Sequence, residues 1–378
     1  ETLHRLGVTD MFGYPGGAVI PIYDEIYSFP DIKHYFVRHE QGAAHAADGY
    51  ARVSGKVGVC LATSGPGATN LVTGIMTAYM DSVPMVAITG QVGRPFIGKD
   101  SFQEADIQGI TMPITKHNYL VQDIRDLPRI IKEAYFIAST GRPGPVLIDI
   151  PKDIQTEKIS MTEYNKLYEV PIQLEGYDPT YKGHQGQIKK AATLIKNAKR
   201  PLIIAGAGVL KSGAVDELKA LAETAHIPVT NTLVGLGGFP GDHELALGMV
   251  GMHGSVAANN STDEADLVIA AGIRFHDRIT GHPDFFCKKA KIIHIDIDPA
   301  EIDKNVTIDV PIVGDLKRVL TELNALVEPA KHEAWLEQIH QWQEEYPIVV
   351  PESTDGELHP QYVLSELNKI VKDDAIIV

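Results

Sequence analysis

Three short glycine-rich or charged segments each follow an apolar run that predicts a β-strand. They are residues 13–18 (GYPGGA), 38–43 (RHEQGA) and 63–70 (TSGPGATN). Glycine lets backbone amides approach a ligand closely, and the carboxyl ends of parallel strands form the ligand crevice of open α/β sheets. Glu40 is therefore a candidate for proton chemistry at that edge, although an acid in the first helical turn commonly just complements the helix dipole.

Similar glycine turns occur at residues 141–145, 206–208 and 272–274, and we expect them to follow strands too. The turn at 206–208 has Lys211 where the GxGxxG dinucleotide fingerprint needs a third glycine. Residues 63–70 lack the Lys-Ser/Thr pair of a P-loop, so an NTPase is disfavoured; Thr69 or Asn70 could cap the helix that follows.

The composition excludes several classes of function. The 378 residues carry a net charge of −15, which argues against nucleic acid as a partner, because phosphate binding needs clustered Lys and Arg. Cys60 and Cys287 are the two cysteines and do not form a CxxC motif, which disfavours a zinc site or disulfide framework and favours a reducing, cytoplasmic location. Apolar runs do not approach the roughly 20 residues that span a bilayer, so a membrane partner is not expected.

Alternation of strands and helices predicts an α/β fold with doubly wound parallel sheets. In the first part we expect strands at 11–14, 34–37, 57–62, 85–89 and 145–150, and helices at 22–27, 41–52, 69–81 and 127–139. In the second part we expect helices at 187–198 and 214–224, and strands at 201–205, 228–231, 267–271 and 291–297. These strands are apolar without alternation, as in sheets buried on both faces.

Changes in composition predict the domain boundaries. We expect a first domain at 1–155, a linker without a helical period at 156–185, a second domain at 186–350, and a third that starts at 358–378 after a boundary near 354–357. The third would open with a helix at 360–371 and a strand at 375–378. Residues 1–6 resemble the end of a helix entered midway, so we expect truncation at both ends.

The ordered motifs GYPGGA, RHEQGA, TSGPGATN, TGQV, SFQEAD, GRPGPVLIDIPKD, GMHG and RFHDRITG resemble the acetohydroxyacid (acetolactate) synthase catalytic subunit, a thiamine-diphosphate enzyme family. The resemblance runs the length of the chain. It implies a pyrimidine-binding thiamine-diphosphate domain followed by a central Rossmann-like FAD domain. It also implies decarboxylating condensation of two pyruvates, or of pyruvate and 2-oxobutyrate, in branched-chain amino-acid biosynthesis.

The resemblance assigns roles to residues of the first domain. Glu40 matches the catalytic glutamate, which hydrogen-bonds N1′ of the cofactor's aminopyrimidine. The matching cofactor-side positions are Gly16, Gly17, Pro66, Asn70 and Gln91. Substrate positions are Gln91, Phe102, Gln103, Lys116 and, in the second domain, Arg278, whose guanidinium fork suits a carboxylate.

The flavin contacts implied by the resemblance lie largely in the second domain. They are Arg142, Gly206, Ala207, Gly208, Thr232, Leu233, Gly251, Met252, His253, Gly272, Arg274, Asp277, Arg278, Asp296, Ile297 and Asp315. His276 departs from the family's usual RFDDR run. The segment still favours the flavin-containing biosynthetic enzyme over its flavin-free catabolic relative, and the flavin's role in the family is structural.

The GDG motif that anchors Mg²⁺ and the diphosphate does not occur; 241–243 is GDH and 314–316 is GDL. We therefore predict no metal ligand here and expect the Mg²⁺ site in a missing C-terminal domain, with this fragment inactive alone. The family places its active site at a subunit interface, so we expect a homodimer or tetramer, with a small regulatory subunit as a further candidate partner.

Two alternatives stay open. The chain could serve another thiamine-diphosphate/FAD enzyme of 2-oxoacids such as a pyruvate oxidase, which redox cycling of the flavin would reveal. It could instead be a nucleotide-binding or regulatory module, which tight FAD binding without oxoacid chemistry would favour. Glyoxylate carboligase is disfavoured by Glu40, because that relative lacks the acid.

Overall fold

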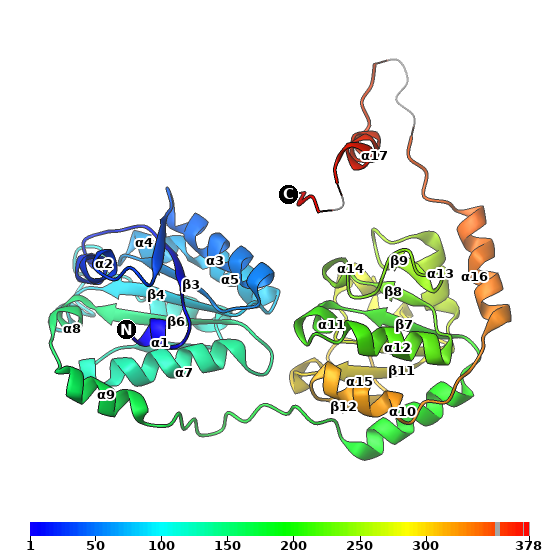
Figure 1. The fold of residues 1–378 in the computed structure, drawn as a ribbon, viewed down its shortest axis with the longest axis horizontal. Coiled ribbons are helices and arrows are strands. Elements are labelled where there is room, and N and C mark those ends of the chain that lie inside the picture. Colours follow the sequence, from blue (N-terminus) through cyan, green and yellow to red (C-terminus); the bar gives the residue numbers. More distant parts are fainter. Residues whose placement is uncertain (352–355, 373, 378) are drawn as a thin grey trace. The chain divides into compact units, whose positions relative to one another are not determined.

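In a computed structural model the chain divides into two compact units, Glu1–Pro179 and Thr180–Val378 (Figure 1). The structure describes residues 1–351, 356–372 and 374–377. Each unit is built on one six-stranded sheet in which the paired strands run parallel, as the sequence predicts for an α/β fold.

The first sheet has the order β2-β1-β3-β4-β6-β5. Its strands are β1 (Asp10–Gly13), β2 (Lys33–Phe36), β3 (Gly58–Ala62), β4 (Met85–Gln91), β5 (His117–Leu120) and β6 (Pro145–Pro151). Every residue of β3, β4 and β6 is buried. This is why these strands appear in the sequence as unbroken apolar runs.

Helices cover both faces of this sheet. Those of the first unit are α1 (Thr2–Arg5), α2 (Ile20–Tyr27), α3 (Glu40–Ser54), α4 (Pro66–Asn70), α5 (Val72–Met80), α6 (Ile107–Thr111), α7 (Leu127–Ser139), α8 (Lys152–Thr156) and α9 (Met161–Glu169). Alanines of α3 and α5 pack with Cys60 and Ala87 on one face. On the other face, apolar residues of α7 pack against Val86 and Ile148.

The second sheet has the order β12-β11-β10-β7-β8-β9. Its strands are β7 (Pro201–Ala205), β8 (Val229–Asn231), β9 (Ala246–Met249), β10 (Leu267–Ala271), β11 (Lys291–Asp296) and β12 (Val310–Val313). Counted from β7, this is the doubly wound order 3-2-1-4-5-6, whose ligand crevice lies where the order reverses, between the first and fourth strands. That point is the boundary between β7 and β10.

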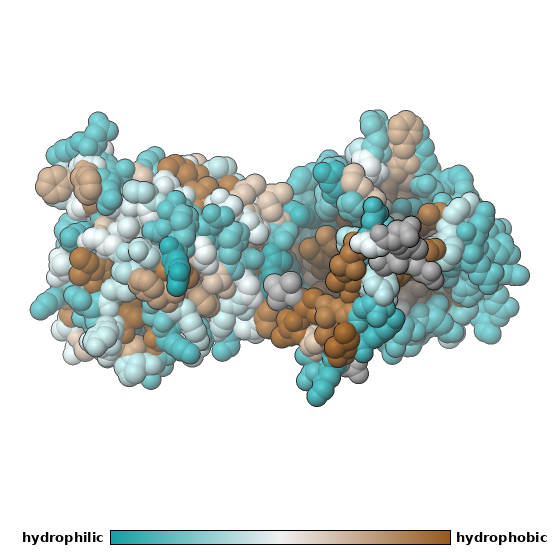
Figure 2. All heavy atoms as spheres, turned by 90° about the horizontal axis from the view of Figure 1, so that it is seen from above, coloured by the Kyte–Doolittle hydropathy of each residue, from teal (hydrophilic) through white to brown (hydrophobic). Residues whose placement is uncertain are grey.

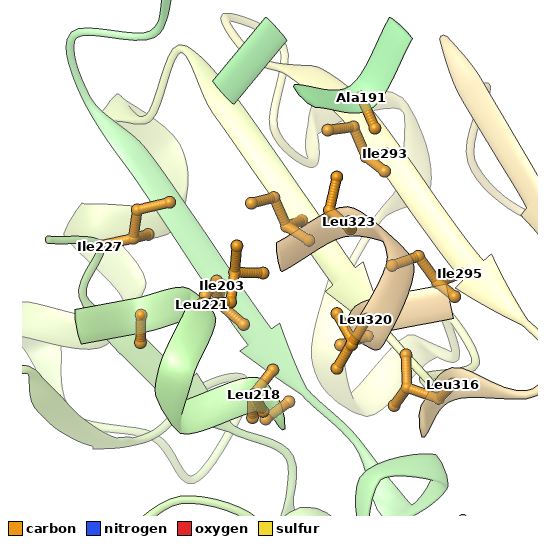
Figure 3. Close-up of a cluster of buried hydrophobic side chains, with 14 of the residues drawn as sticks. Ala191, Ile203, Leu218, Leu221, Ile227, Ile293, Ile295, Leu316, Leu320 and Leu323 are labelled. Carbon is orange, nitrogen blue, oxygen red and sulfur yellow. The ribbon is translucent and has the colours of Figure 1, made fainter. Parts of the chain in front are cut away.

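The helices of the second unit are α10 (Gln185–Asn197), α11 (Ala207–Lys211), α12 (Val215–Ala225), α13 (Val256–Glu264), α14 (Asp277–Thr280), α15 (Leu316–Asn324), α16 (Glu333–Glu345) and α17 (Pro360–Ile370). Figure 3 shows Leu218 and Leu221 of α12, with Leu316, Leu320 and Leu323 of α15, pointing onto strand residues such as Ile203 and Ile295. A second cluster, with Trp335 and Ile339 of α16, covers the other face.

Several predictions about elements are wrong. The expected helix 69–81 is two helices, α4 and α5, and α4 begins already at Pro66. The expected linker contains α9, whose tyrosines Tyr164 and Tyr168 lie beneath the guanidinium of Arg5. Residues 375–377 form no strand, and Val378, like residues 352–355 around the expected boundary, lies outside the described residues.

Candidate active site

The chemistry-bearing turns of the first unit lie side by side. Strands β2, β1 and β3 are neighbours, so the turns after them meet at one edge of the sheet. Glu40 is the first residue of α3, directly after the N-cap His39, whose side chain accepts a hydrogen bond from the Gln41 amide at 3.1 Å. The helix dipole therefore acts on the Glu40 carboxylate as well.

Asn70 holds the Glu40 side chain. Its amide Nδ2 donates to Glu40 Oε2 at 2.9 Å. Asn70 ends α4, and the cap of that helix is Gly65 with φ of 57°, so the expectation that Thr69 or Asn70 caps it is wrong. A positive φ of this kind favours glycine, because a Cβ would make it strained.

Small residues surround Thr63, the first residue of the third turn, where this turn meets the first. A Cβ on Gly16 would lie 2.5 Å from Thr63 Cγ2, and one on Gly67 would lie 2.6 Å from the same atom and 3.1 Å from Glu40 Oε1. Thr63 Oγ1 accepts from the Ala18 amide at 3.1 Å. A Cβ on Gly17, by contrast, would meet open space. The three turns therefore form a cradle of backbone beside the Glu40 carboxyl, whose Oε1 no described residue bonds. This arrangement fits a flat heteroaromatic ring.

The TGQV and SFQEAD residues lie at the next strand end. Gln91 closes β4 and is buried, and its carboxamide is fully bonded within the unit, to Ala105 O, Asp149 and the Val92 amide. Phe102 is 88% exposed. Gln103 has φ of 56°, and its carbonyl oxygen would lie 2.6 Å from a Cβ on Gly65. The structure thus places Gln103 against the turn of Asn70 and Pro66.

Asp149 was not predicted as a site residue, yet it belongs to this region. It lies on β6 with 1% exposure and accepts from Thr89 Oγ1 at 2.7 Å and from Gln91 Nε2 at 2.9 Å. Burial raises the pKa of its carboxyl to about 7, against the lowering effect of these two hydrogen bonds. An acid inside the apolar run VLIDIP was the available sequence signal.

Lys116 and Arg142 lie at the opposite end of the strands of the same sheet, where β5 and β6 begin. The turn 141–145 precedes β6 and does not follow a strand, so that expectation is wrong. Lys116 Nζ donates to the Thr140 carbonyl at 2.7 Å and to Tyr177 Oη at 2.9 Å, while Arg142 Nε donates to Ser82 Oγ at 2.8 Å. A seven-residue strand such as β6 separates this edge from that of Glu40 by roughly 20 Å.

In the second unit, two glycine turns touch at the reversal of strand order. Gly206 follows β7 and Gly272 follows β10. The Gly208 amide donates to the Gly272 carbonyl at 3.0 Å, and a Cβ on Gly206 would lie 2.2 Å from that oxygen. Gly272 has φ of 62°. Only glycine fits this approach, and Gly206 with Ala207 opens α11 there, a backbone arrangement that suits a dinucleotide.

Polar groups without partners surround this point. Arg274 is half-buried, and no described residue bonds its guanidinium. Asn231, at the end of β8, has a buried Oδ1 without a hydrogen-bond partner among the described residues. Thr232 beside it is buried, and Leu233 is 68% exposed. A ligand with donors and an anionic group would satisfy them, so these residues fit FAD.

The GMHG and RFHDRITG segments lie together. Gly251 has φ of 100°, and the Met252 amide donates to the Arg278 carbonyl at 2.9 Å. Asn259, which sequence reasoning missed, accepts a hydrogen bond from the Gly251 amide at 2.9 Å and donates one to the Gly251 carbonyl at 3.0 Å. The Arg278 guanidinium lies 3.5 Å from Asp277 and is largely exposed, and His253 is exposed as well.

The remaining predicted flavin residues have structural contacts of their own. Asp296 ends β11, is 9% exposed and accepts from the Asp298 amide at 2.9 Å, with Ile297 between them. Asp315 caps α15 through the Arg318 amide. A role in flavin binding for these residues stays a prediction.

Within residues 1–351, 356–372 and 374–377, no group of three or more His, Cys, Asp or Glu side chains is arranged to hold a metal ion. In the same ranges, none of the helices has the length and apolar character needed to cross a membrane.

Family models match both units. Residues 1–110 match the thiamine pyrophosphate enzyme N-terminal TPP binding domain, and residues 188–323 match the thiamine pyrophosphate enzyme central domain. The chain belongs to the thiamine pyrophosphate enzymes. The first model contains the three turns around Glu40, and the central-domain model contains the reversal point at Gly206 and Gly272.

Relatives along the whole chain narrow the family. The chain is 50% identical to the acetolactate synthase large subunit of Corynebacterium glutamicum, covering all of this chain and 60% of that protein. It is 52% identical to a probable acetolactate synthase large subunit of Methanocaldococcus jannaschii, with 99% and 63% covered. It is 50% identical to the acetolactate synthase large subunit of Porphyra purpurea, covering 99% of this chain and 64% of that protein. The chain thus spans about three-fifths of the length of these curated relatives, and the resemblance stated from the sequence is confirmed.

Proposed function

We propose that the protein containing this chain is an acetolactate synthase. It would condense two pyruvates to 2-acetolactate, or pyruvate with 2-oxobutyrate to 2-aceto-2-hydroxybutyrate, with loss of carbon dioxide. The hydrogen bond between Asn70 and Glu40, inside a cradle of glycine backbone, is the observation that supports it most directly. Similarity to acetolactate synthase large subunits over the whole chain supports the choice of reaction.

Glu40 is the proposed proton-handling group. Asn70 engages Oε2 and leaves Oε1 to meet a ring nitrogen of the cofactor, so the carboxyl is oriented before the cofactor binds. Bound thiamine diphosphate supplies the nucleophilic carbon and the electron sink that decarboxylation of a 2-oxoacid needs. Gly16, Gly17 and Pro66 line the aminopyrimidine side of this site, where a larger side chain at Gly16 would strike Thr63.

We assign the carboxylate of the second oxoacid to Arg278, whose exposed fork can bind it bidentately. Phe102 and Gln103, on the loop that touches Gly65, would line the acceptor side. Lys116 and Gln91 remain proposed substrate residues, although their polar groups are bonded within the first unit.

FAD is the proposed second cofactor, held at the reversal of strand order in the second unit. Gly206, Gly208 and Gly272 allow close backbone approach there, and Arg274 and Asn231 offer polar groups that no described residue bonds. Because the proposed reaction has no net redox change, FAD would act structurally. Mg²⁺ and the cofactor's diphosphate would be bound by a GDG-containing segment, which residues 1–378 do not contain.

Self-association is part of the proposal, as a homodimer or tetramer with the site at the subunit interface, together with a regulatory subunit. Hydrophobic areas reach the surface in several places (Figure 2). One is a shallow groove on α5, lined by Val72, Met76 and Met80. An apolar helix face of this kind suits association with another subunit.

The test uses the protein expressed from its complete gene, with thiamine diphosphate, Mg²⁺ and FAD. Glu40→Gln retains the shape of the side chain and an oxygen for Asn70, but removes the titratable oxygen. We expect acetolactate formation to fall by at least about a hundredfold, the range of a lost general acid–base group. Glu40→Gln with wild-type activity would overturn the proposed role of the carboxyl.

A further inference from the structure

Gln91 joins the end of β4 to a loop that returns to the Glu40 site. Its Nε2 donates to the Ala105 carbonyl at 2.8 Å and to Asp149 Oδ2 at 2.9 Å, while its Oε1 accepts from the Val92 amide at 2.9 Å. The carboxamide therefore bonds both ends of the loop formed by residues 92–105. A side chain used in this way anchors the backbone of the loop.

Asp149 fixes the orientation of that carboxamide. It lies beside Thr89 in the register of β6 on β4, and the side chains of Thr89 and Gln91 point to the same face of β4, two residues apart. The Asp149 carboxyl accepts from both, at 2.7 and 2.9 Å. The Gln91 NH₂ group faces two acceptors, Asp149 Oδ2 and the Ala105 carbonyl oxygen. The carboxamide therefore has one orientation, with Nε2 toward both acceptors.

The loop itself is held at two further places. Near its start, Arg94 Nε donates to Asp153 Oδ2 at 2.7 Å, and its Nη1 donates to the Gln122 carbonyl at 2.7 Å. Within the loop, the Glu104 carboxylate accepts from the amides of Gly98 and Ser101. These bonds shape the loop, but Gln91 holds the end that follows Phe102 and Gln103.

The end of the loop that contains Gln103 lies against the turn 63–70. Gln103 packs so closely on Gly65 that a Cβ there would lie 2.6 Å from its carbonyl oxygen. Gly65 in turn caps the helix whose last residue, Asn70, holds Glu40. A shift of Ala105, two residues beyond Gln103, would therefore move Gln103 relative to the Glu40 cradle.

We propose that Asp149 is a positioning residue, which anchors the loop 92–105 through Gln91 and so places Gln103 against Gly65, in the turn whose Asn70 holds Glu40. Asp149 is 1% exposed, and its carboxyl accepts hydrogen bonds from Thr89 and Gln91. The positioning role rests on the function proposed above, because the Glu40 turn matters only if the site is catalytic. The anchor itself can be measured without any activity.

Two substitutions at Asp149 separate the anchor from mere burial. In Asp149→Asn, the amide oxygen can still accept from Gln91 Nε2, and the new NH₂ can donate to Thr89 Oγ1, so the anchor should survive. In Asp149→Val, Gln91 Nε2 loses its side-chain acceptor, and the carboxamide can rotate away from Ala105. Gln91→Asn is a third variant, which stays polar but is one methylene too short to reach Ala105.

The readout is amide hydrogen exchange of the full 378-residue chain, followed in peptides covering residues 98–105. Asp149→Val and Gln91→Asn should exchange there roughly tenfold faster than wild type, the factor of one lost hydrogen bond. Asp149→Asn should match wild type. Peptides from α7, in the same unit, should be unchanged in all three variants and serve as the internal reference.

Three results would overturn the proposal. They are unchanged loop exchange in Gln91→Asn, equal acceleration in the loop and in α7, and acceleration in Asp149→Asn as large as in Asp149→Val. If Asp149→Val does not fold, the exchange rates of Gln91→Asn and Asp149→Asn still test the proposed anchor. Absence of acetolactate synthesis would refute the proposed function without altering the exchange result, so the two failures are distinguishable.

Discussion

At the scale of single residues, two carboxyls of the first unit have opposite environments. Glu40 is half-exposed at a helix N-terminus and accepts one amide donor, so it can exchange a proton with a ligand. Asp149 is enclosed in the sheet, and burial raises the pKa of its carboxyl to about 7. The first environment suits chemistry, and the second suits the holding of a neighbouring side chain.

The raised pKa of Asp149 predicts a pH-dependent stability. The native state binds this proton more tightly than the unfolded chain does, so the free energy of unfolding should fall as pH rises from about 4 to about 7. The loss is at most about 4 kcal/mol. Urea unfolding of wild type and Asp149→Asn at pH 4, 6 and 8 measures it. The variant should gain stability relative to wild type as pH rises, and a constant difference would contradict the prediction.

Removal of the amide that holds Glu40 should affect catalysis more than folding. In Asn70→Leu the carboxylate loses the amide donor that holds it in place. We expect acetolactate synthesis by the complete protein to slow roughly tenfold, because the carboxyl is no longer held in one orientation.

Thr69→Ala is the control for Asn70→Leu, because the Thr69 hydroxyl donates to the Pro66 carbonyl of its own helix. A rate of acetolactate synthesis that is the same for Asn70→Leu, Thr69→Ala and wild type would contradict the proposed role of Asn70 in holding Glu40.

At the scale of elements, the central strands could be predicted and most edge strands could not. β7 and β10 have the expected bounds, because central parallel strands are apolar throughout. The missed strands β5, β9 and β12 are all sheet edges. They are half-covered, and β12 contains a proline, so their sequences lack the apolar run on which the prediction depended.

The candidate site, too, could be predicted from the sequence only in part. The convergence of the turns after β1, β2 and β3 followed from the glycine pattern and the strand-end rule. Asp149 was missed, because a single acid inside an apolar strand gives no spacing from which to infer a partner. The turn 141–145 was assigned to the wrong end of the strands, because the helix α7, and not a strand, directly precedes it.

The contact between two turns of the second unit predicts a steric effect. Gly206→Ala would place a Cβ 2.2 Å from the Gly272 carbonyl oxygen, both being backbone-anchored. We expect a loss of about 1 to 3 kcal/mol in the free energy of unfolding, the range for overpacking. Gly241→Ala, where a Cβ meets open space, should change it by less than about 0.5 kcal/mol. Equal stability of the two variants in urea titrations would show that the turns can separate freely.

At the scale of the whole molecule, each unit has its own sheet and cores, and each carries one proposed cofactor site. The first contains the proposed proton-handling carboxyl, and the second contains the proposed FAD site. Carboligation and flavin-dependent oxidation of pyruvate could both use such a pair of sites. Similarity to acetolactate synthase large subunits favours carboligation.

The products formed from pyruvate decide between these reactions. The protein expressed from its complete gene, with thiamine diphosphate, Mg²⁺ and FAD, should convert two pyruvates to one acetolactate, while the flavin absorbance stays that of the oxidised form. Acetate formation with bleaching of the flavin, or the absence of acetolactate under these conditions, would contradict the proposed carboligase.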